Sequence, residues 1–304
     1  MINGMAHLGE SNHDWLSDGA HLDLAEEFDV RGLAHNASQI GLLEQIADAW
    51  VQETSMNVLP DGRNEMLWRC CTNAAQCWNH LEGEHDPDGK RGGITLPWVG
   101  PKYPQSRVAL MGLNLVRSGG LLDEINITRD TINAFKNGER IVWEGSGQFQ
   151  YRSSAMLSAV LAALDGKEIP DEPTESTMDL VEPVLRTARI QAVKCSPWGD
   201  GASPPSADMK RLCMPSLLPI EIEILKPKVL IVAHSEARGR LWYLAGKPKW
   251  DDRDHFTVGK ATVNGHEFTI LGVIHPSDRG GLWKDSWNQL VAYLREDGSA
   301  LAAI

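Results

Sequence analysis

The chain has 304 residues, of which 42% are hydrophobic and 23% charged, and its formal net charge is -12. This composition is typical of a globular protein and excludes a disordered or collagen-like chain. No stretch approaches the roughly 18 apolar residues of a membrane span, and residues 1–18 lack the basic flank and apolar block of a signal peptide. We therefore expect a cytoplasmic protein that does not bind membranes.

The net charge argues against a protein that binds nucleic acid through a broad basic surface. Residues 1–60, however, hold ten acidic side chains and one basic side chain, Arg31, so the remaining 244 residues carry only -3 of the -12. Phosphate binding needs local charge rather than a basic average. Basic residues near the loops discussed below are Lys102, Arg107, Arg117, Lys194, Arg238, Arg240, Arg279 and Lys284.

Residues 1–60 are predicted to form an acidic helical extension, and residues 61–304 an α/β domain. Ile40, Leu43, Ala47, Trp50 and Val51 fall on one helical face, with Ser38 as the expected cap. The simplest interpretation is a helix packed on the body of the protein. The acidic segment would alternatively mimic DNA and occupy a basic groove. Residues 82–93, rich in Gly, Asp and His, are predicted to form an exposed loop.

From residue 107 onward, short apolar runs alternate with helical patterns, which is typical of an α/β fold. Continuous apolar runs suit strands that are buried on both faces. The predicted strands are 108–111, 190–193, 229–233 and 268–274. Helices are expected over 153–164 and 217–225, with Pro219 interrupting the second. The fold class is therefore α/β, a three-layer α/β/α arrangement with a central, mainly parallel four-stranded sheet and an N-terminal helical extension.

Polar segments follow three of these strands. They are Gly112-Leu113-Asn114-Leu115, Lys194-Cys195-Ser196-Pro197 and His275-Pro276-Ser277. In an open parallel sheet the ligand crevice lies outside the carboxyl ends of the strands, so the three segments should converge there.

The three segments, in this order, resemble motifs of the uracil-DNA glycosylase superfamily, whose members break the bond between a base and its deoxyribose. The resemblance implies that Asn114 holds the attacking water and that His275 donates a hydrogen bond to the departing base. This chain has Leu115 where related branches have proline. Taken alone, Asn114 would be a turn residue that ends a strand.

The resemblance also implies a pocket for a base flipped out of the DNA stack. Gly112, Leu113 and Ser277 would line this pocket, Phe149 would stack on the base, and Gln191 would read its edge. The alternative is that Phe149 is a core residue that precedes a helix. The iron-sulfur branches have asparagine where this chain has Gln191, and glutamine reaches one methylene further. We therefore expect a modified pyrimidine, of the bulky kind found in phage DNA, rather than plain uracil.

Four residues are predicted to contact DNA. Lys194 and Arg279 would bind phosphates, and Leu282 or Trp283 would fill the gap left by the flipped nucleotide. Leu282 or Trp283 could equally be a core residue at the start of a helix.

The cysteines suggest a metal centre. Cys195 and Cys213 lie in the segment most similar to the iron-sulfur branches, where both positions bind a [4Fe-4S] cluster. Two further ligands would come from Cys77 and either Cys70 or Cys71, at a looser spacing than in those branches. The alternative is a set of buried cysteines without metal.

The sequence therefore predicts a DNA glycosylase that acts as a monomer on DNA and removes a modified pyrimidine, with a role in antiviral defence. A first alternative is a uracil-DNA glycosylase of base-excision repair. A second alternative is a DNA-binding or sensor protein of weak catalytic power, since a fold does not fix a function.

Overall fold

The structure, a computed structural model of the chain, describes residues 24–30, 32, 35–54, 57–60, 66–69, 95–113, 122–140, 147–194, 205, 207–278 and 280–302. The strands are β1 (Asn57–Pro60), β2 (Met66–Arg69), β3 (Trp98–Val99), β4 (Val108–Gly112), β5 (Thr187–Gln191), β6 (Val229–Val232), β7 (Asp251–Asp252), β8 (Phe256–Val263) and β9 (His266–Val273). The helices are α2 (Leu24–Val30), α3 (Ala37–Thr54), α5 (Tyr103–Ser106), α6 (Asp123–Lys136), α7 (Gly147–Leu164), η1 (Met178–Leu180), α8 (Val181–Leu185), α9 (Ala207–Leu225), α10 (Ser235–Leu244) and α11 (Leu282–Ala302).

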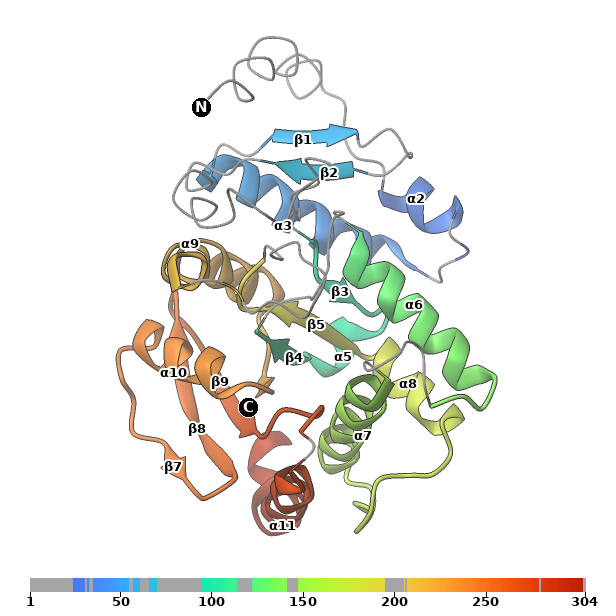
Figure 1. The fold of residues 1–304 in the computed structure, drawn as a ribbon, viewed down its shortest axis with the longest axis vertical. Coiled ribbons are helices and arrows are strands. Elements are labelled where there is room, and N and C mark those ends of the chain that lie inside the picture. The colour runs from blue at the N-terminus through green and yellow to red at the C-terminus, as the bar shows by residue number, and fades with distance from the viewer. Residues whose placement is uncertain are drawn as a thin grey trace.

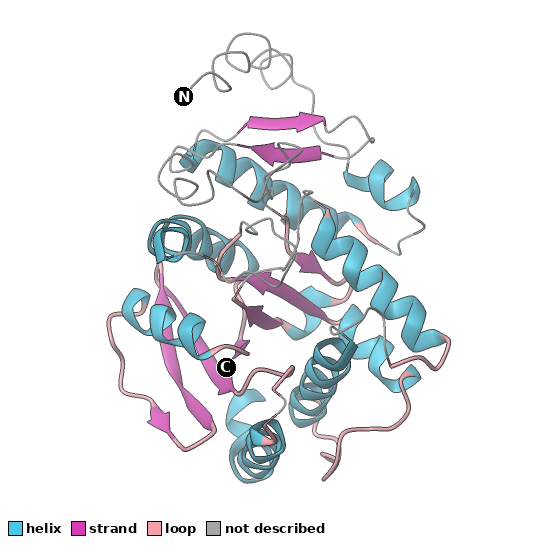
Figure 2. Cartoon of the chain, viewed as in Figure 1, coloured by secondary structure: helices cyan, strands magenta, loops and turns pink. Residues whose placement is uncertain are grey.

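The main sheet is mixed and has seven strands in the order β3-β5-β4-β6-β9-β8-β7 among the described residues. Its middle strands β5, β4, β6 and β9 are parallel, and β3, β8 and β7 pair antiparallel at the two sides. The α/β class is confirmed (Figure 2). The expected sheet of four strands was too small, because the four predicted strands are only the parallel middle of a larger sheet.

The sequence reading missed β8, which pairs with β9 through a tight hairpin. Val263 pairs with His266, and the two turn residues Asn264 and Gly265 have φ values of 48° and 76°. An Asn-Gly pair at positive φ favours the two-residue turn whose twist matches the strands on either side. This dipeptide between two strand-like segments was the signal for an antiparallel addition to the sheet.

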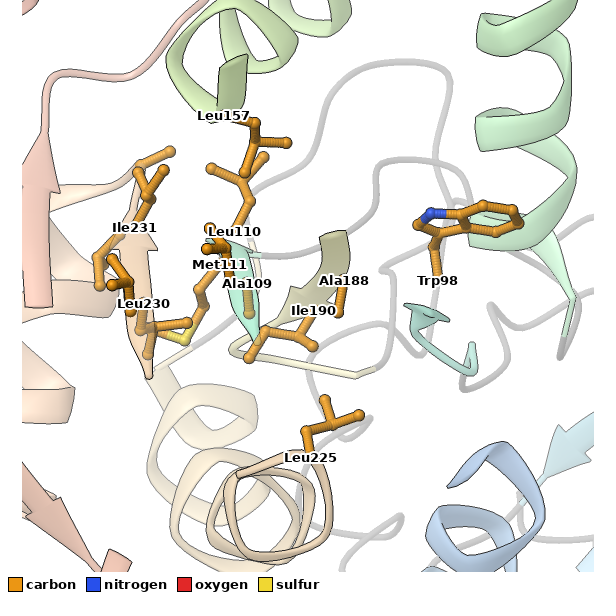
Figure 3. Close-up of a cluster of buried hydrophobic side chains, with 14 of the residues drawn as sticks. Trp98, Ala109, Leu110, Met111, Leu157, Ala188, Ile190, Leu225, Leu230 and Ile231 are labelled. Carbon is orange, nitrogen blue, oxygen red and sulfur yellow. The ribbon is translucent and has the colours of Figure 1, made fainter. Parts of the chain in front are cut away.

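Helices cover both faces of the parallel strands. Figure 3 shows Leu157 of α7 on one side of β4, β5 and β6, and Leu225 of α9 on the other. Both side chains are buried, as are Ala109 and Ile231 in the strands between them. Helix α11 lies beside α7 (Figure 1) and also contacts β9. The parallel strands β4, β5 and β6 are fully buried, as continuous apolar strands require.

Two predicted elements needed correction. The strand expected at 190–193 is β5, Thr187–Gln191, so Gln191 ends the strand instead of lying inside it. Helix α9 continues through Pro215 and Pro219, and Pro219 does not interrupt it. The apolar face of α9, including Leu217, Leu218 and Ile222, is buried against the body of the protein. We attribute the continuity of the helix to this burial, which offsets the hydrogen bonds that the prolines cannot form.

Helix α3 belongs to the main core. Leu43, Ile46 and Trp50 are fully buried, and α3 packs against α9 and β3. The cap of α3 is Asn36 rather than Ser38, because the Asn36 Oδ1 atom accepts a hydrogen bond from the Gln39 backbone N–H at 2.9 Å.

The expected domain boundary at residue 60 falls between β1 and β2, which pair antiparallel. The acidic residues 1–23 and the loop expected at 82–93 lie outside the described residues. None of the helices in the described ranges is both long and apolar enough to cross a membrane.

Candidate active site

The carboxyl ends of the four parallel strands bring chemistry-bearing residues to one edge of the sheet. Gly112 ends β4, Gln191 ends β5, His234 follows β6 closely and His275 follows β9. Gly112 and Gln191 are register partners. Segments more than 150 residues apart in the chain therefore meet at this edge, as the sequence predicted for Gly112 and His275.

The ring of His275 is held by the loop that contains it. Its Nδ1 atom accepts a hydrogen bond from the Ser277 backbone N–H at 3.2 Å, and its carbonyl oxygen accepts one from the Asp278 N–H at 2.8 Å. Burial, aided by the neighbouring His234, lowers the pKa of His275 to about 4. The ring is therefore neutral at physiological pH. Because Nδ1 acts as acceptor, the proton lies on Nε2, and His275 offers one N–H donor.

Two aromatic rings contact His275. The Phe149 ring lies 5.2 Å from the imidazole, centroid to centroid, at an interplanar angle of 31°, and the His234 ring lies 5.8 Å away at 82°. Phe149 is half-buried in the first turn of α7. The predicted stacking residue and the predicted hydrogen-bond donor are thus neighbours, and their two rings contact each other.

His234 was missed by the sequence reading. Its Nδ1 atom accepts from the Glu236 N–H at 3.2 Å, which caps α10, and burial lowers its pKa. The available signal was its position directly after the apolar run that forms β6, the same signal that identified His275. His234 adds a second imidazole to the site and helps keep His275 neutral.

Arg152 of α7 holds the loop after His275. Its Nη1 atom donates hydrogen bonds to the carbonyl oxygens of Pro276 and Asp278, each at 2.9 Å, and its guanidinium lies 4.5 Å from the centroid of a Trp283 ring. One turn of α7 thus places Phe149 and anchors the His275 loop through Arg152.

The β5–β4 end of the edge holds a buried polar network. Gln191 donates from Nε2 to the Glu124 carboxylate at 3.0 Å, and Arg189 donates to Ser154 at 2.8 Å and to Gln150. Gln191, Glu124 and Arg189 are all buried. Burial raises the pKa of Glu124 and lowers that of Arg189 to about 10, while the attraction between the two side chains opposes both shifts. Glu124 and Arg189 were not singled out in the sequence.

Lys194 does not occupy a position from which it could bind DNA. Its side chain is 1% exposed, and Nζ forms an ion pair with Glu221 and donates to the carbonyl oxygen of Gln191. The Nζ atom also lies 5.6 Å from the Trp50 ring centroid. The prediction of a phosphate contact is corrected, because the core supplies the partners that a phosphate would have supplied.

The two candidate wedge residues differ in exposure. Leu282, the first residue of α11, is 41% exposed, whereas Trp283 is 7% exposed and lies 5.8 Å from Trp287, centroid to centroid. Leu282 can reach a neighbouring molecule. Trp283 instead fits the core alternative at the start of a helix.

Several predicted residues lie outside the described residues. They are Asn114, Arg279, Cys70, Cys71, Cys77 and Cys195. Cys213 is buried in α9, and its Sγ atom accepts a hydrogen bond from the Lys194 N–H at 3.2 Å, so it lies next to the segment that leads into Cys195. Within the described ranges, no three His, Cys, Asp or Glu side chains are grouped to hold a metal ion.

A separate hollow of about 620 Å³ lies between the ends of α7 and α11, lined among others by Leu164, Ile169 and Leu294. Leu164 and Phe149 stand at opposite ends of α7, about 22 Å apart at the helical rise per residue. The hollow is therefore distinct from the histidine edge.

No protein-family model matches this chain, and a search of curated proteins returned no match.

Proposed function

We propose that this protein is a DNA N-glycosylase, which hydrolyses the bond between deoxyribose and a base flipped out of the helix. The observation that carries the proposal is the neutral His275 ring, which keeps Nε2–H as a donor and lies 5.2 Å from the Phe149 ring, centroid to centroid. An aromatic face and a neutral donor suit a planar base that gains negative charge as it departs. The proposal includes a three-layer α/β/α order around the parallel strands.

In the proposed reaction Phe149 stacks on the extracted base and His275 donates to its carbonyl oxygen. The electron pair of the glycosidic bond moves to the base, and water adds its oxygen to the sugar carbon while giving up a proton, which neutralises the departed base anion. Asn114, from the loop after β4, is assigned the task of holding that water. A neutral imidazole suits the donor role, because it stabilises the base anion without first having to be protonated.

The proposed substrate is a modified pyrimidine in DNA, with phage DNA as its source. The support is Gln191, to which the resemblance assigns the reading of the base: its side chain is longer than that of asparagine and is hydrogen-bonded to Glu124. Leu282 is assigned as the wedge that replaces the flipped nucleotide, on the ground of its exposure.

A [4Fe-4S] cluster is a second part of the proposal. Cys213 and the segment leading into Cys195 are adjacent, which fits a shared ligand site, and the remaining thiolates would come from Cys77 and either Cys70 or Cys71. The cluster would tie the N-terminal segment to the core without taking part in the reaction. Iron and sulfide analysis of anaerobically purified protein would test it, with Cys213→Ser as the comparison.

Base release from a panel of DNAs tests the proposed activity. The panel comprises uracil-containing oligonucleotides, ordinary DNA and phage DNA with hypermodified pyrimidines, each scored by alkali-sensitive strand breaks with Asn114→Ala as control. We expect breaks in the modified DNA. Breaks confined to uracil would make this a repair enzyme, and no breaks in any DNA would leave only a binding role.

A further inference from the structure

The amide of Gln191 is oriented by a single buried partner. Its Nε2 atom lies 3.0 Å from Oε2 of Glu124, and the two side chains are 8% and 3% exposed. A carboxylate only accepts hydrogen bonds, so the nitrogen of the amide must face Glu124 and the oxygen must face away. Burial raises the pKa of Glu124, and Arg189, buried close by, opposes that rise together with the hydrogen bond from Gln191.

The oxygen of that amide has no partner among the described residues. Gln191 Oε1 is buried, and leaving a buried acceptor without a hydrogen bond costs about 1–3 kcal/mol. This cost indicates that a partner arrives from outside the network.

Gly112 provides the space for this oxygen. A Cβ atom at position 112 would lie 2.6 Å from Gln191 Oε1, well inside van der Waals contact. The oxygen therefore lies against the last residue of β4, at the same edge as His275 and two positions before Asn114 in the sequence. Of the two polar side-chain atoms of Gln191, Nε2 is hydrogen-bonded to Glu124, whereas Oε1 has no partner in the described part of the chain.

We propose that Glu124 and Gly112 together lock Gln191 as a hydrogen-bond acceptor, so that the site selects a base that presents an N–H donor at its Watson–Crick edge. This inference rests on the proposed glycosylase function and names its substrate class. An amide that can turn over accepts or donates as the base requires, whereas a locked amide places its oxygen in one position. Two sources supply the donor: the ring N3–H of uracil-type bases and the exocyclic amine of cytosine-type bases.

Matched bases test the acceptor. Oligonucleotides would carry uracil, cytosine, their 5-hydroxymethyl derivatives or pyrimidin-2-one, which keeps the ring and 2-carbonyl oxygen but has no N–H at N3 and no group at C4. We expect wild-type protein to favour a donor-bearing base over pyrimidin-2-one by about 5- to 150-fold in kcat/KM, the equivalent of one unpaired buried group. The preference among the donor-bearing bases shows whether a ring N3–H or an exocyclic amine donates the hydrogen bond.

Substitution of Glu124 tests the lock. Glutamine at position 124 has nearly the same shape as glutamate but can pair with either end of the Gln191 amide. In Glu124→Gln, the ratio of kcat/KM for a donor-bearing base to kcat/KM for pyrimidin-2-one should therefore fall close to one, while pyrimidin-2-one is still released. Gly112→Ala, which displaces Oε1 without touching Glu124, should also reduce the preference. Thermal unfolding would confirm that both variants fold.

The outcomes separate this inference from the proposed function. Wild-type protein that releases base but shows the same preference after Glu124→Gln and Gly112→Ala would overturn the lock. Protein that releases nothing would overturn the glycosylase. In that case the same ratio, measured as binding of each oligonucleotide to Asn114→Ala protein, still decides whether Gln191 selects a donor.

Discussion

The two halves of the strand edge are built differently. In the β5–β4 half, the side chains of Gln191, Glu124 and Arg189 are buried and bonded to other side chains. In the β6–β9 half, His234 and His275 are only half-buried and accept hydrogen bonds from backbone N–H groups. The first half is fixed by its own network before any ligand arrives, and the second keeps its imidazole donors available. This division suits one half to recognising a base and the other to promoting its departure.

The largest expected effect is a loss of stability when the buried ion pair beneath the β5–β4 half is broken. Lys194→Met leaves Glu221 as an unpaired buried charge and should lower the free energy of unfolding by about 3–5 kcal/mol, measured by urea denaturation. Lys102→Met is the control, because its pair with Glu182 is exposed and should cost less than about 1 kcal/mol. If Lys194→Met protein had normal stability but bound DNA more weakly and with less salt dependence, the prediction that Lys194 binds a phosphate would be correct after all.

The next largest effect is expected when the hydrogen-bond donor of the β6–β9 half, His275, is removed. His275→Ala should lower the rate constant of base release about 100- to 1000-fold while leaving the preference among bases unchanged, because the reading network is intact. Single-turnover kinetics on the best substrate of the panel measure the loss. His255→Ala, which alters a histidine on the approach to β8, serves as control and should keep the wild-type rate. A shift in base preference with His275→Ala would contradict the division of roles.

The protonation state of His275 gives a further test of the β6–β9 half. Its folded pKa of about 4 is below the ordinary value of 6.5, so between these pH values the unfolded chain binds a proton that the folded protein does not. The contribution of His275 to stability is therefore present above pH 6.5 and is lost as the pH falls toward 4. An NMR titration of labelled histidine, assigned with His275→Ala, should show a midpoint near 4. A midpoint near 6.5 would mean that the ring is open to water.

A smaller effect is expected from the residue that joins α7 to the histidine loop. Arg152→Lys keeps the positive charge but cannot reach both carbonyl oxygens and stack on Trp283 in the same way. We expect kcat to fall about tenfold, the equivalent of about 1.4 kcal/mol, with KM little changed. A change confined to KM would indicate that Arg152 binds DNA.

The smallest effect on stability is expected at the exposed residue of α11. Leu282→Ala should change the free energy of unfolding by less than about 0.5 kcal/mol and slow base release from duplex DNA more than from single-stranded DNA. Trp283→Ala should instead cost about 3–5 kcal/mol of stability. Equal rates of Leu282→Ala and wild type on duplex DNA would remove the wedge role.

Local patterns predicted the parallel middle of the sheet, because uninterrupted apolar runs require burial on both faces. The same logic, a polar residue directly after such a run, placed His275 at the edge and would have placed His234. The Asn264-Gly265 turn was a local signal for β8 that went unused. The features that the sequence could predict are therefore those that depend on residues close together in the chain.

The remaining features depend on partners far apart in the chain. Glu124 meets Gln191 across 67 positions, and Lys194 meets Glu221 across 27. No pattern around Lys194 shows that its side chain turns inward, and a basic residue after a strand is equally suited to a phosphate. Burial of such a charge is decided by tertiary contacts, which a single sequence does not display.

Heavy-oxygen water gives the most direct test of the central claim, that this protein hydrolyses a glycosidic bond. Modified phage DNA would be incubated with the protein in labelled water, and the freed base and the sugar fragment would be weighed by mass spectrometry. Hydrolysis predicts an unlabelled free base and one labelled oxygen on the sugar carbon, with both products formed about 100- to 1000-fold more slowly by His275→Ala. An intact base on every strand, from protein that is folded and binds the DNA, would contradict the glycosylase.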